Sequence, residues 1–432
     1  MIVTKSNFLR KYFNLNPDCF LIKGKKRGAI YDLVNGDVYS IDEDSVDILT
    51  QCEKRISMGE VIRLISGVES QEILEYFSKL ESLGLGEITD KGQNIQKQIL
   101  SSLGIKKNLD FIWLELTEKC NLRCLHCYGQ EDFKQKDRDD KRSLILYDDW
   151  IRIIKEARQQ GCRKLQFIGG EPMLFKGNIF ELIKLAKVLE YEIIEVFTNA
   201  TLLRKEDINL LAKYGAQVAI SVYSYRSEIH DKITRQKGSF NKTVNNVKAL
   251  RAENVKVRLA LTVMKQNEGD ITETVDFLKD LNDSEDWGSI DVVRCVGGGL
   301  NKEILPKKMI PVQRNANFGR ISKEQFFRRK SGHSCWQGKL CVTFAGDVLP
   351  CIMGRNEKIG NIKKDSLTGI LNSDKLIKLW GLSKDKIEVC RDCEYRYVCF
   401  DCRPQAKGET GNLYAKPKEC LYNPYIGEWQ SA

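Results

Sequence analysis

The chain has 432 residues, of which 42% are hydrophobic and 30% are charged, and its formal net charge is +10. This length predicts two or three domains, and the composition is that of a globular protein rather than a disordered or fibrous one. No run of about 18 apolar residues is present, so the sequence predicts no membrane span.

The N-terminal stretch MIVTKSNFLRKYF lacks the apolar core and the small-residue cleavage site of a secretory signal, so we expect a cytoplasmic protein. In a reducing cytosol, 15 cysteines indicate metal or redox chemistry rather than a disulfide framework. The positive charge fits either a solvated basic surface or an acidic partner. No nucleic-acid-binding motif is found, and we expect no nucleic-acid or membrane partner.

Residues 1–90 are predicted to form a small α+β, winged-helix-like domain. Short apolar runs are broken by Gly24, Gly28 and the Asn35-Gly36 pair, which predicts strands joined by hairpins. A helix is expected from Asp42 to Cys52, and two further helical patterns follow it. The polar residues 91–110 are predicted to be a linker.

From residue 111 onward, apolar runs alternate with amphipathic helical patterns. This rhythm predicts an α/β fold, a partial (β/α)6 TIM-like barrel over residues 111–310, with chemistry at the carboxyl ends of its strands. The charged run at residues 131–142 is predicted to be a solvated loop. The six predicted strands are residues 111–116, 164–170, 192–198, 217–223, 255–263 and 289–294.

Residues 311–432 form a predicted cysteine-rich domain. The segment VTFAGDVLP, between Cys341 and Cys351, predicts a hairpin, and residues 366–382 predict one helix. The remainder of this region is expected to be loop.

Three cysteines follow the first predicted barrel strand with C-x3-C-x2-C spacing: Cys120, Cys124 and Cys127. A structural zinc site needs four ligands, which these thiolates and His126 can supply in number. A 4Fe–4S cluster held by three cysteines instead leaves one iron open to a small molecule. The spacing alone favours iron–sulfur over zinc and leaves both readings open.

This motif, followed by an aromatic residue, resembles the radical S-adenosylmethionine (SAM) family. The resemblance implies that SAM binds the open iron, and that reductive cleavage of SAM yields a 5′-deoxyadenosyl radical that takes a hydrogen atom from substrate. Further positions match the family in order along the strand ends. The resemblance implies that SAM contacts Tyr128, Gly169, Gly170, Glu171, Pro172, Thr198, Asn199, Ser221 and Arg235. It identifies no catalytic acid or base.

Eight cysteines lie in the C-terminal region, and their number fits two zinc sites or two iron–sulfur clusters equally. Their spacing resembles the SPASM extension of peptide-modifying radical SAM enzymes, which implies two auxiliary 4Fe–4S clusters and three clusters in all. The implied ligands are Cys335, Cys341, Cys351 and Cys402 for the first auxiliary cluster, and Cys390, Cys393, Cys399 and Cys420 for the second. The remaining cysteines, Cys19, Cys52, Cys162 and Cys295, are expected to be buried thiols.

The N-terminal domain resembles the recognition element of enzymes that modify ribosomally made peptides. The resemblance implies that it binds the leader of a precursor peptide as an added strand. As an acidic partner for the net charge of +10, we expect an electron donor such as flavodoxin or ferredoxin. The segment AISVYSYRSEIHDKITRQKGSF resembles thioether-forming maturases, which implies an oxidoreductase that makes a cysteine thioether cross-link. Alternatives are C–C cross-linking, epimerisation, formylglycine formation or, from another class, a zinc-stabilised peptide- or DNA-binding protein.

Overall fold

The computed structural model describes residues 8–102, 104, 108–129, 144–285, 287–306, 320–400 and 402–430. The predicted loop at residues 131–142 and the predicted domain boundary at residue 310 lie outside these ranges. Within them, no helix combines the length and the apolar character that crossing a lipid bilayer requires.

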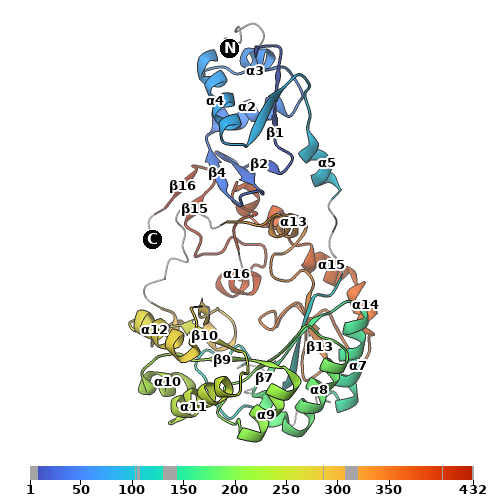
Figure 1. Cartoon of the computed structure of the whole chain (residues 1–432), viewed down its shortest axis with the longest axis vertical. Coiled ribbons are helices and arrows are strands. Elements are labelled where there is room, and N and C mark those ends of the chain that lie inside the picture. The colour runs from blue at the N-terminus through green and yellow to red at the C-terminus, as the bar shows by residue number, and fades with distance from the viewer. Residues whose placement is uncertain are drawn as a thin grey trace.

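The N-terminal unit contains two small antiparallel sheets and three helices (Figure 1). One sheet has the strand order β2-β3-β4, and the other pairs β1 with β5. A turn with Gly36 at φ +83° joins β3 to β4, as the sequence predicts. The elements are β1 (Tyr12–Leu15), β2 (Cys19–Lys23), β3 (Gly28–Asp32), β4 (Val38–Ile41), α2 (Glu43–Cys52), α3 (Met58–Leu64), α4 (Ser70–Ser82) and β5 (Gly86–Thr89).

The predicted helix from Asp42 to Cys52 is confirmed as α2, with Asp42 as its N-cap: the carboxylate accepts a hydrogen bond from the Ser45 N–H. The predicted linker differs from expectation, because it contains helix α5 (Ile95–Ser101). The Asn94 side chain caps this helix, and the buried Gln96 side chain donates to the carbonyls of Leu15 and Asn16. The helix is therefore tied to the N-terminal unit.

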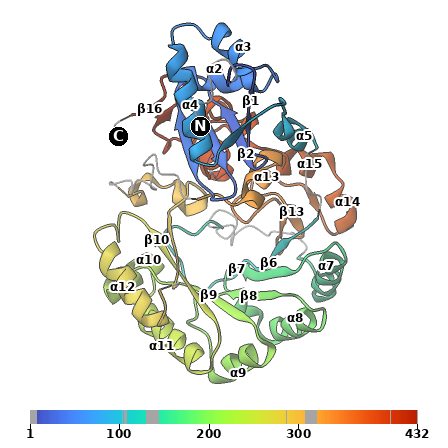
Figure 2. The ribbon, with the colours of Figure 1, turned by 45° about the horizontal axis from the view of Figure 1, so that its top comes forward.

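All six predicted barrel strands are present, and adjacent strands pair in parallel. They are β6 (Phe111–Thr117), β7 (Lys164–Gly169), β8 (Ile193–Phe197), β9 (Gln217–Ser221), β10 (Val257–Val263) and β11 (Gly288–Val292). Figure 2 shows helices along the outer side of the curved sheet. They are α7 (Tyr147–Gln159), α8 (Lys176–Val188), α9 (Lys205–Tyr214), α10 (Ser227–Thr234), α11 (Ser239–Ala252) and α12 (Ile271–Asn282). The predicted partial barrel is confirmed.

The C-terminal region extends this sheet. Strand β12 (Lys339–Val342) pairs in parallel with β6, and β13 (Asp347–Leu349) and β14 (Gly360–Asn361) follow in antiparallel order. The predicted hairpin is therefore present, and it joins the barrel. The other elements are α13 (Lys323–Ser331), α14 (Leu367–Leu371), α15 (Asp374–Trp380), α16 (Arg403–Thr410), β15 (Tyr422–Asn423) and β16 (Glu428–Trp429).

The prediction of one helix over residues 366–382 is wrong, because the segment forms the two helices α14 and α15. The Ser373 hydroxyl accepts a hydrogen bond from the Leu376 N–H and so begins a new helix. A serine at such a position competes with helix continuation and favours a cap.

The β2-β3-β4 sheet is covered on both faces. Residues such as Leu21 and Ile30 pack toward the N-terminal helices. On the other face, Phe20, Ala29 and Tyr31 share an apolar core with C-terminal residues. Figure 1 shows the N-terminal unit seated on the C-terminal region, with the barrel at the opposite end of the molecule.

Candidate active site

The loop with Cys120, Cys124 and Cys127 lies at the carboxyl end of β6. Backbone hydrogen bonds hold it from two sides: Glu171 N–H donates to the Lys119 carbonyl (2.7 Å), and Leu125 N–H donates to the Ile233 carbonyl at the end of α10 (3.0 Å). A side chain is not tolerated at Gly170, because its Cβ would lie 2.1 Å from the Lys119 carbonyl oxygen. The GGE segment thus fixes the path of the chain into the cysteine loop.

The three thiols of this loop are partly buried and lie near one another. Burial raises the pKa of Cys127 to about 11, and it raises the pKa of Cys124 further, with the charges of Cys127 and Cys120 as the next causes. Thiolates gathered in this way repel each other unless a cationic group lies between them. The thiol set is therefore suited to a bound cationic group, and its role as the ligand set of an iron–sulfur cluster stays a prediction.

His126, the fourth side chain that a zinc site requires, points elsewhere. Its ring lies edge-to-face against Tyr223, with 4.9 Å between the ring centroids, and burial lowers its pKa to about 4. In the described part of the chain, no three Cys, His, Asp or Glu side chains are close enough to hold a single metal ion.

Glu171 connects the ends of β7 and β8. Its fully buried carboxylate accepts hydrogen bonds from the Thr198 hydroxyl (2.5 Å) and from the N–H groups of Met173 (3.0 Å) and Asn199 (2.8 Å). The Asn199 amide donates to Asn121 and lies 4.0 Å from the Cys120 sulfur. The sequence-predicted residues at these two strand ends are therefore brought together with the cysteine loop, while their predicted contacts with SAM stay predictions.

The remaining predicted SAM contacts surround the same loop. Pro172 begins a buried turn, Ser221 ends β9, and Tyr128 lies within the loop itself. Arg235 is exposed, with φ +57° at the end of α10, next to the residues that bond the loop. The structure thus places all nine positions at one end of the barrel.

Sequence reasoning missed a buried ion pair beside Tyr128. Glu115, on β6, is fully buried, and both its carboxylate oxygens accept hydrogen bonds from the Arg355 guanidinium (2.8 Å each). The Tyr128 hydroxyl also donates to Glu115 (3.0 Å). Arg355 belongs to the C-terminal region, so this network joins that region to the cysteine loop. A charged residue within a buried strand was the available signal.

Sequence reasoning also missed the glycine run after β11. Gly298 N–H donates to the Cys127 carbonyl (2.9 Å). A Cβ at Gly297, whose φ is +55°, would lie 2.3 Å from the Tyr128 carbonyl oxygen. Three consecutive glycines, separated from the end of β11 by four residues, were the signal, because glycine permits such close backbone approach.

The C-terminal thiols lie in two groups. Burial raises the pKa of Cys351 to about 12, with the charges of Cys335 and Cys402 as the next causes, and Cys341 lies beside Cys351. Cys393 lies beside Cys399 and Cys390 and packs against the same apolar core as Cys420. These two groups match the two predicted ligand sets, whose roles as ligands stay predictions. The four cysteines outside the predicted sets are buried, as expected.

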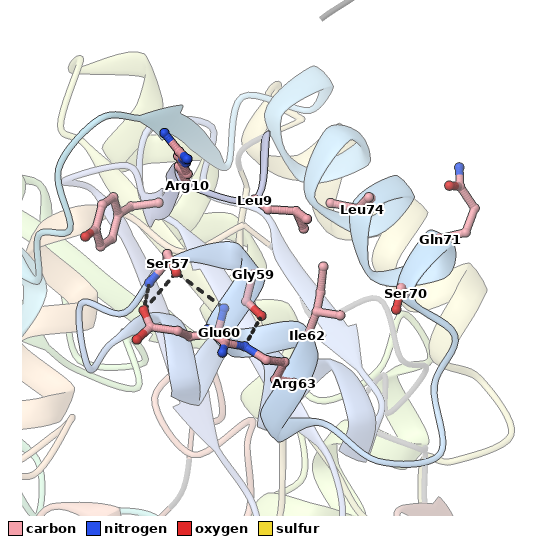
Figure 3. A pocket seen from close by; sticks show the side chains of 11 residues that line it. Leu9, Arg10, Ser57, Gly59, Glu60, Ile62, Arg63, Ser70, Gln71 and Leu74 are labelled. Carbon is pink, nitrogen blue, oxygen red and sulfur yellow. Dashed lines mark hydrogen bonds between the residues drawn. The ribbon is translucent and has the colours of Figure 1, made fainter. Parts of the chain in front are cut away.

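The N-terminal unit presents two surfaces suited to a peptide. One is the outer edge of β4, which pairs with β3 and with no other strand of the described residues. The other is a groove of about 680 Å³, which Figure 3 shows between the chain before β1 and helices α3 and α4. Leu9, Ile62 and Leu74 supply apolar lining, and Arg10 and Arg63 supply positive charge.

Comparison with known proteins agrees with this arrangement. The profile of the Radical SAM superfamily matches residues 114–278, and the SPASM profile, an iron-sulfur cluster-binding domain, matches residues 335–394. The fold and its strand-end cysteine loop thus define a radical SAM enzyme. The chain contains a radical SAM domain and a SPASM domain, which together imply SAM and iron–sulfur clusters as cofactors.

Among curated relatives, the chain is 27% identical to the antilisterial bacteriocin subtilosin biosynthesis protein AlbA of Bacillus subtilis, over 71% of this chain and 70% of that protein. It is 25% identical to the AdoMet-dependent heme synthase of Methanosarcina barkeri, over 72% of this chain and 95% of that protein. Among solved structures, Streptococcus suis SuiB bound to precursor peptide SuiA superposes with a TM-score of 0.57 at 18% identity. That match covers 94% of this chain and 99% of SuiB, and it shows a shared fold.

Proposed function

We propose that this enzyme modifies a ribosomally made precursor peptide and forms a cysteine thioether cross-link in it. The observation that carries the proposal is the joint presence of the barrel, the SPASM domain and an N-terminal unit with an open edge strand. The relationship to a bacteriocin biosynthesis protein and the fold shared with a peptide-bound enzyme support it.

The residues of this chain have distinct tasks in the proposed reaction. Cys120, Cys124 and Cys127 hold the cluster that binds SAM, and the strand-end residues around Glu171 shape the pocket for it. The C-terminal thiols hold two auxiliary clusters. When bound, SAM and the clusters supply a 5′-deoxyadenosyl radical that takes a hydrogen atom from substrate and an acceptor for the remaining electron.

The cross-link joins a cysteine sulfur to a carbon of the same peptide. The carbon loses a hydrogen atom, the thiol loses a proton, and one further electron leaves the substrate. The product therefore weighs two hydrogen atoms less than the substrate and has one fewer free thiol. These two changes distinguish a thioether from the alternatives: epimerisation changes neither mass nor thiol content, and a C–C cross-link keeps the thiol.

We also propose that the leader of the precursor binds the N-terminal unit along β4. An antiparallel strand added to a free edge satisfies the outward backbone groups of both chains. The Asp32 N–H donates to the Asp37 carbonyl at the hairpin end. Because hydrogen-bonded pairs alternate along antiparallel strands, the Ser40 N–H points outward from β3.

The test is anaerobic incubation of the reconstituted enzyme with SAM, a reductant and candidate cysteine-containing peptides encoded beside its gene. We expect 5′-deoxyadenosine, the loss of two hydrogen atoms per cross-link, and loss of labelling by iodoacetamide. Mass loss with every thiol still labelled would contradict the thioether.

The heme synthase relative favours a second candidate, modification of a porphyrin. Incubation with an iron porphyrin in place of peptide tests it directly. Turnover of the porphyrin without turnover of any peptide would replace the peptide proposal.

A further inference from the structure

The second group of C-terminal thiols lies on a segment with little regular structure. Among the described residues from Cys390 to Phe400, the short turn at Cys390–Asp392 is the one helical element. Val389, immediately before Cys390, has φ +64°, a strained conformation for a β-branched residue. Such strain persists only where surrounding structure enforces it. The conformation of Val389 therefore indicates that contacts from other parts of the chain hold this segment in place.

The N-terminal sheet supplies several of these contacts. Lys25 N–H, at the tip of the β2–β3 hairpin, donates to the Asp392 carbonyl (2.7 Å). The Arg396 guanidinium donates to the carbonyls of Lys23 and Cys393 (2.8 Å each). On the adjacent face, Phe20 packs against Phe326 with 5.0 Å between the ring centroids.

Tyr31 makes the central contact. Its ring is fully buried on β3, and its hydroxyl donates to the Glu394 carbonyl (2.9 Å) and accepts from the Val398 N–H (3.3 Å). Residues 394 and 398 begin and end the turn between Cys393 and Cys399. One hydroxyl thus fixes both ends of the turn that separates two of the predicted ligands.

We propose that the β2-β3-β4 sheet forms one wall of the second auxiliary cluster site, with Tyr31 as its positioning residue. The inference rests on the cluster assignment within the proposed function and is independent of the peptide substrate. The N-terminal unit then has two roles, because the sheet that offers an edge to a leader also contacts the turn that carries two of the predicted ligands. Without the hydroxyl, the Glu394 carbonyl loses its donor, and the Val398 N–H keeps only its bond to the Tyr395 carbonyl (3.1 Å), so the turn should loosen.

The experiment uses the full-length chain with Cys120, Cys124 and Cys127 replaced by Ala, so that only auxiliary clusters remain. Iron release to a ferrous chelator is followed after anaerobic reconstitution, by absorbance, in this parent and in Tyr31→Phe. The matched control is Tyr39→Phe, on the neighbouring strand, whose ring packs toward the opposite face of the sheet.

We expect Tyr31→Phe to release about half of the iron several-fold faster than the parent, on the order of fivefold, since one of two clusters is affected and the buried Glu394 carbonyl loses its donor. Tyr39→Phe should match the parent. A Tyr31→Phe variant with the parent's release rate would overturn the proposal. A parent that holds no iron after reconstitution would overturn it too, by removing the auxiliary clusters themselves.

A second variant covers the case in which Tyr31→Phe does not fold. Lys25→Pro removes the N–H that bonds Asp392 and fixes φ at an exposed position, whereas Lys25→Ala removes the same side chain and keeps that N–H. We expect Lys25→Pro to release iron faster than Lys25→Ala. Equal rates of iron release would contradict the proposal that the β2-β3-β4 sheet forms one wall of the cluster site. Because no peptide is present, failure of the cross-linking proposal would leave these results unchanged.

Discussion

The cysteine loop of the barrel and the second group of C-terminal thiols are positioned in different ways. Backbone groups at the ends of neighbouring barrel elements hold the loop, at glycines where the chains must approach closely. The second group is held by a sheet that is distant in sequence, since Tyr31 and Glu394 are 363 positions apart. Local motifs therefore encode the first site, whereas the second depends on a contact that no short motif contains.

The largest expected effect tests the cysteine loop of the barrel. Replacing Cys120, Cys124 and Cys127 together with Ala should abolish reductive cleavage of SAM, because no cluster with an open iron can form. The auxiliary sites do not depend on this loop, so bound iron should fall by about a third if three four-iron clusters are present. Chromatography of 5′-deoxyadenosine and an iron assay measure both results. Continued 5′-deoxyadenosine formation would show that the loop does not hold the SAM-binding cluster.

The next effect tests the connection between the barrel and the C-terminal region. Arg355→Met leaves the fully buried Glu115 carboxylate without its cationic partner. Breaking a buried ion pair from one side typically destabilises a protein by about 3 kcal/mol. We expect a clearly lower melting temperature, measured at a fixed scan rate, and partial recovery in the Glu115→Gln, Arg355→Met double variant.

Arg258→Met is the matched control for this prediction. It breaks a two-bond contact with Glu195 inside the barrel, but Arg258 is 42% exposed whereas Arg355 is 16% exposed. A more exposed pair contributes less, because water screens it. An equal loss of stability in both variants would show that the Glu115–Arg355 pair has no special role in joining the two regions.

The sequence predicted the six barrel strands because their apolar runs and turn residues are local features. It predicted the positions at the strand ends for the same reason, since parallel strands bring their carboxyl ends to one edge. It did not predict helix α5, because Asn94 and Gln96 are fixed by contacts with residues about 40 to 80 positions away.

The wall of the second thiol group was also not predicted. The strand residues CFLIK and GAIYD are buried almost throughout, on both faces of the sheet. Near-continuous apolar strands indicate a sheet that is covered on both sides, and this was the available signal. The sequence did not reveal which segment covers the second face, because that depends on side-chain packing across the whole chain.

A smaller expected effect separates leader binding by the N-terminal unit from the contacts that this unit makes with the second group of C-terminal thiols. Deletion of residues 1–90 would also remove the strand residues that share an apolar core with the C-terminal region, so its effect would not be specific to leader binding. A single substitution at the edge of β4 is more specific. Ser40→Pro removes one outward N–H from β4 and should weaken binding of a labelled leader peptide about fivefold, with SAM cleavage unchanged. Ser40→Ala keeps the N–H and should bind like the parent.

The groove lined by α3 and α4 is the alternative surface for leader binding. Arg10→Glu reverses a charge on its rim, far from the outward N–H of Ser40 in sequence. If fluorescence anisotropy shows that Arg10→Glu weakens leader binding while Ser40→Pro does not, the groove rather than the β4 edge is the binding surface.

The smallest expected effect concerns the first C-terminal thiol group, where we predict no spectroscopic change on binding of precursor. Eight cysteines suffice for two fully ligated clusters, and Cys341 is the ligand that would close the first. It is fully buried on β12, which pairs with β6 at Trp113, so the sheet fixes its position. At the other side, burial raises the pKa of Cys402, and the nearby positive charge of Arg294 opposes that rise.

X-ray absorption with a precursor that carries selenocysteine in place of cysteine measures this directly. In the parent enzyme we expect no iron–selenium distance, because no iron of a closed cluster is open to the substrate. Cys341→Ala removes one ligand and should allow that distance to appear, which makes it the positive control. The samples contain SAM, so that the open iron of the cluster on Cys120, Cys124 and Cys127 is occupied. An iron–selenium contact in the parent would then show that an auxiliary iron binds the substrate sulfur, since only an iron with a vacant coordination position can accept it. The assignment to the radical SAM superfamily would stand, and the auxiliary clusters would then act on the substrate directly as well as by electron transfer.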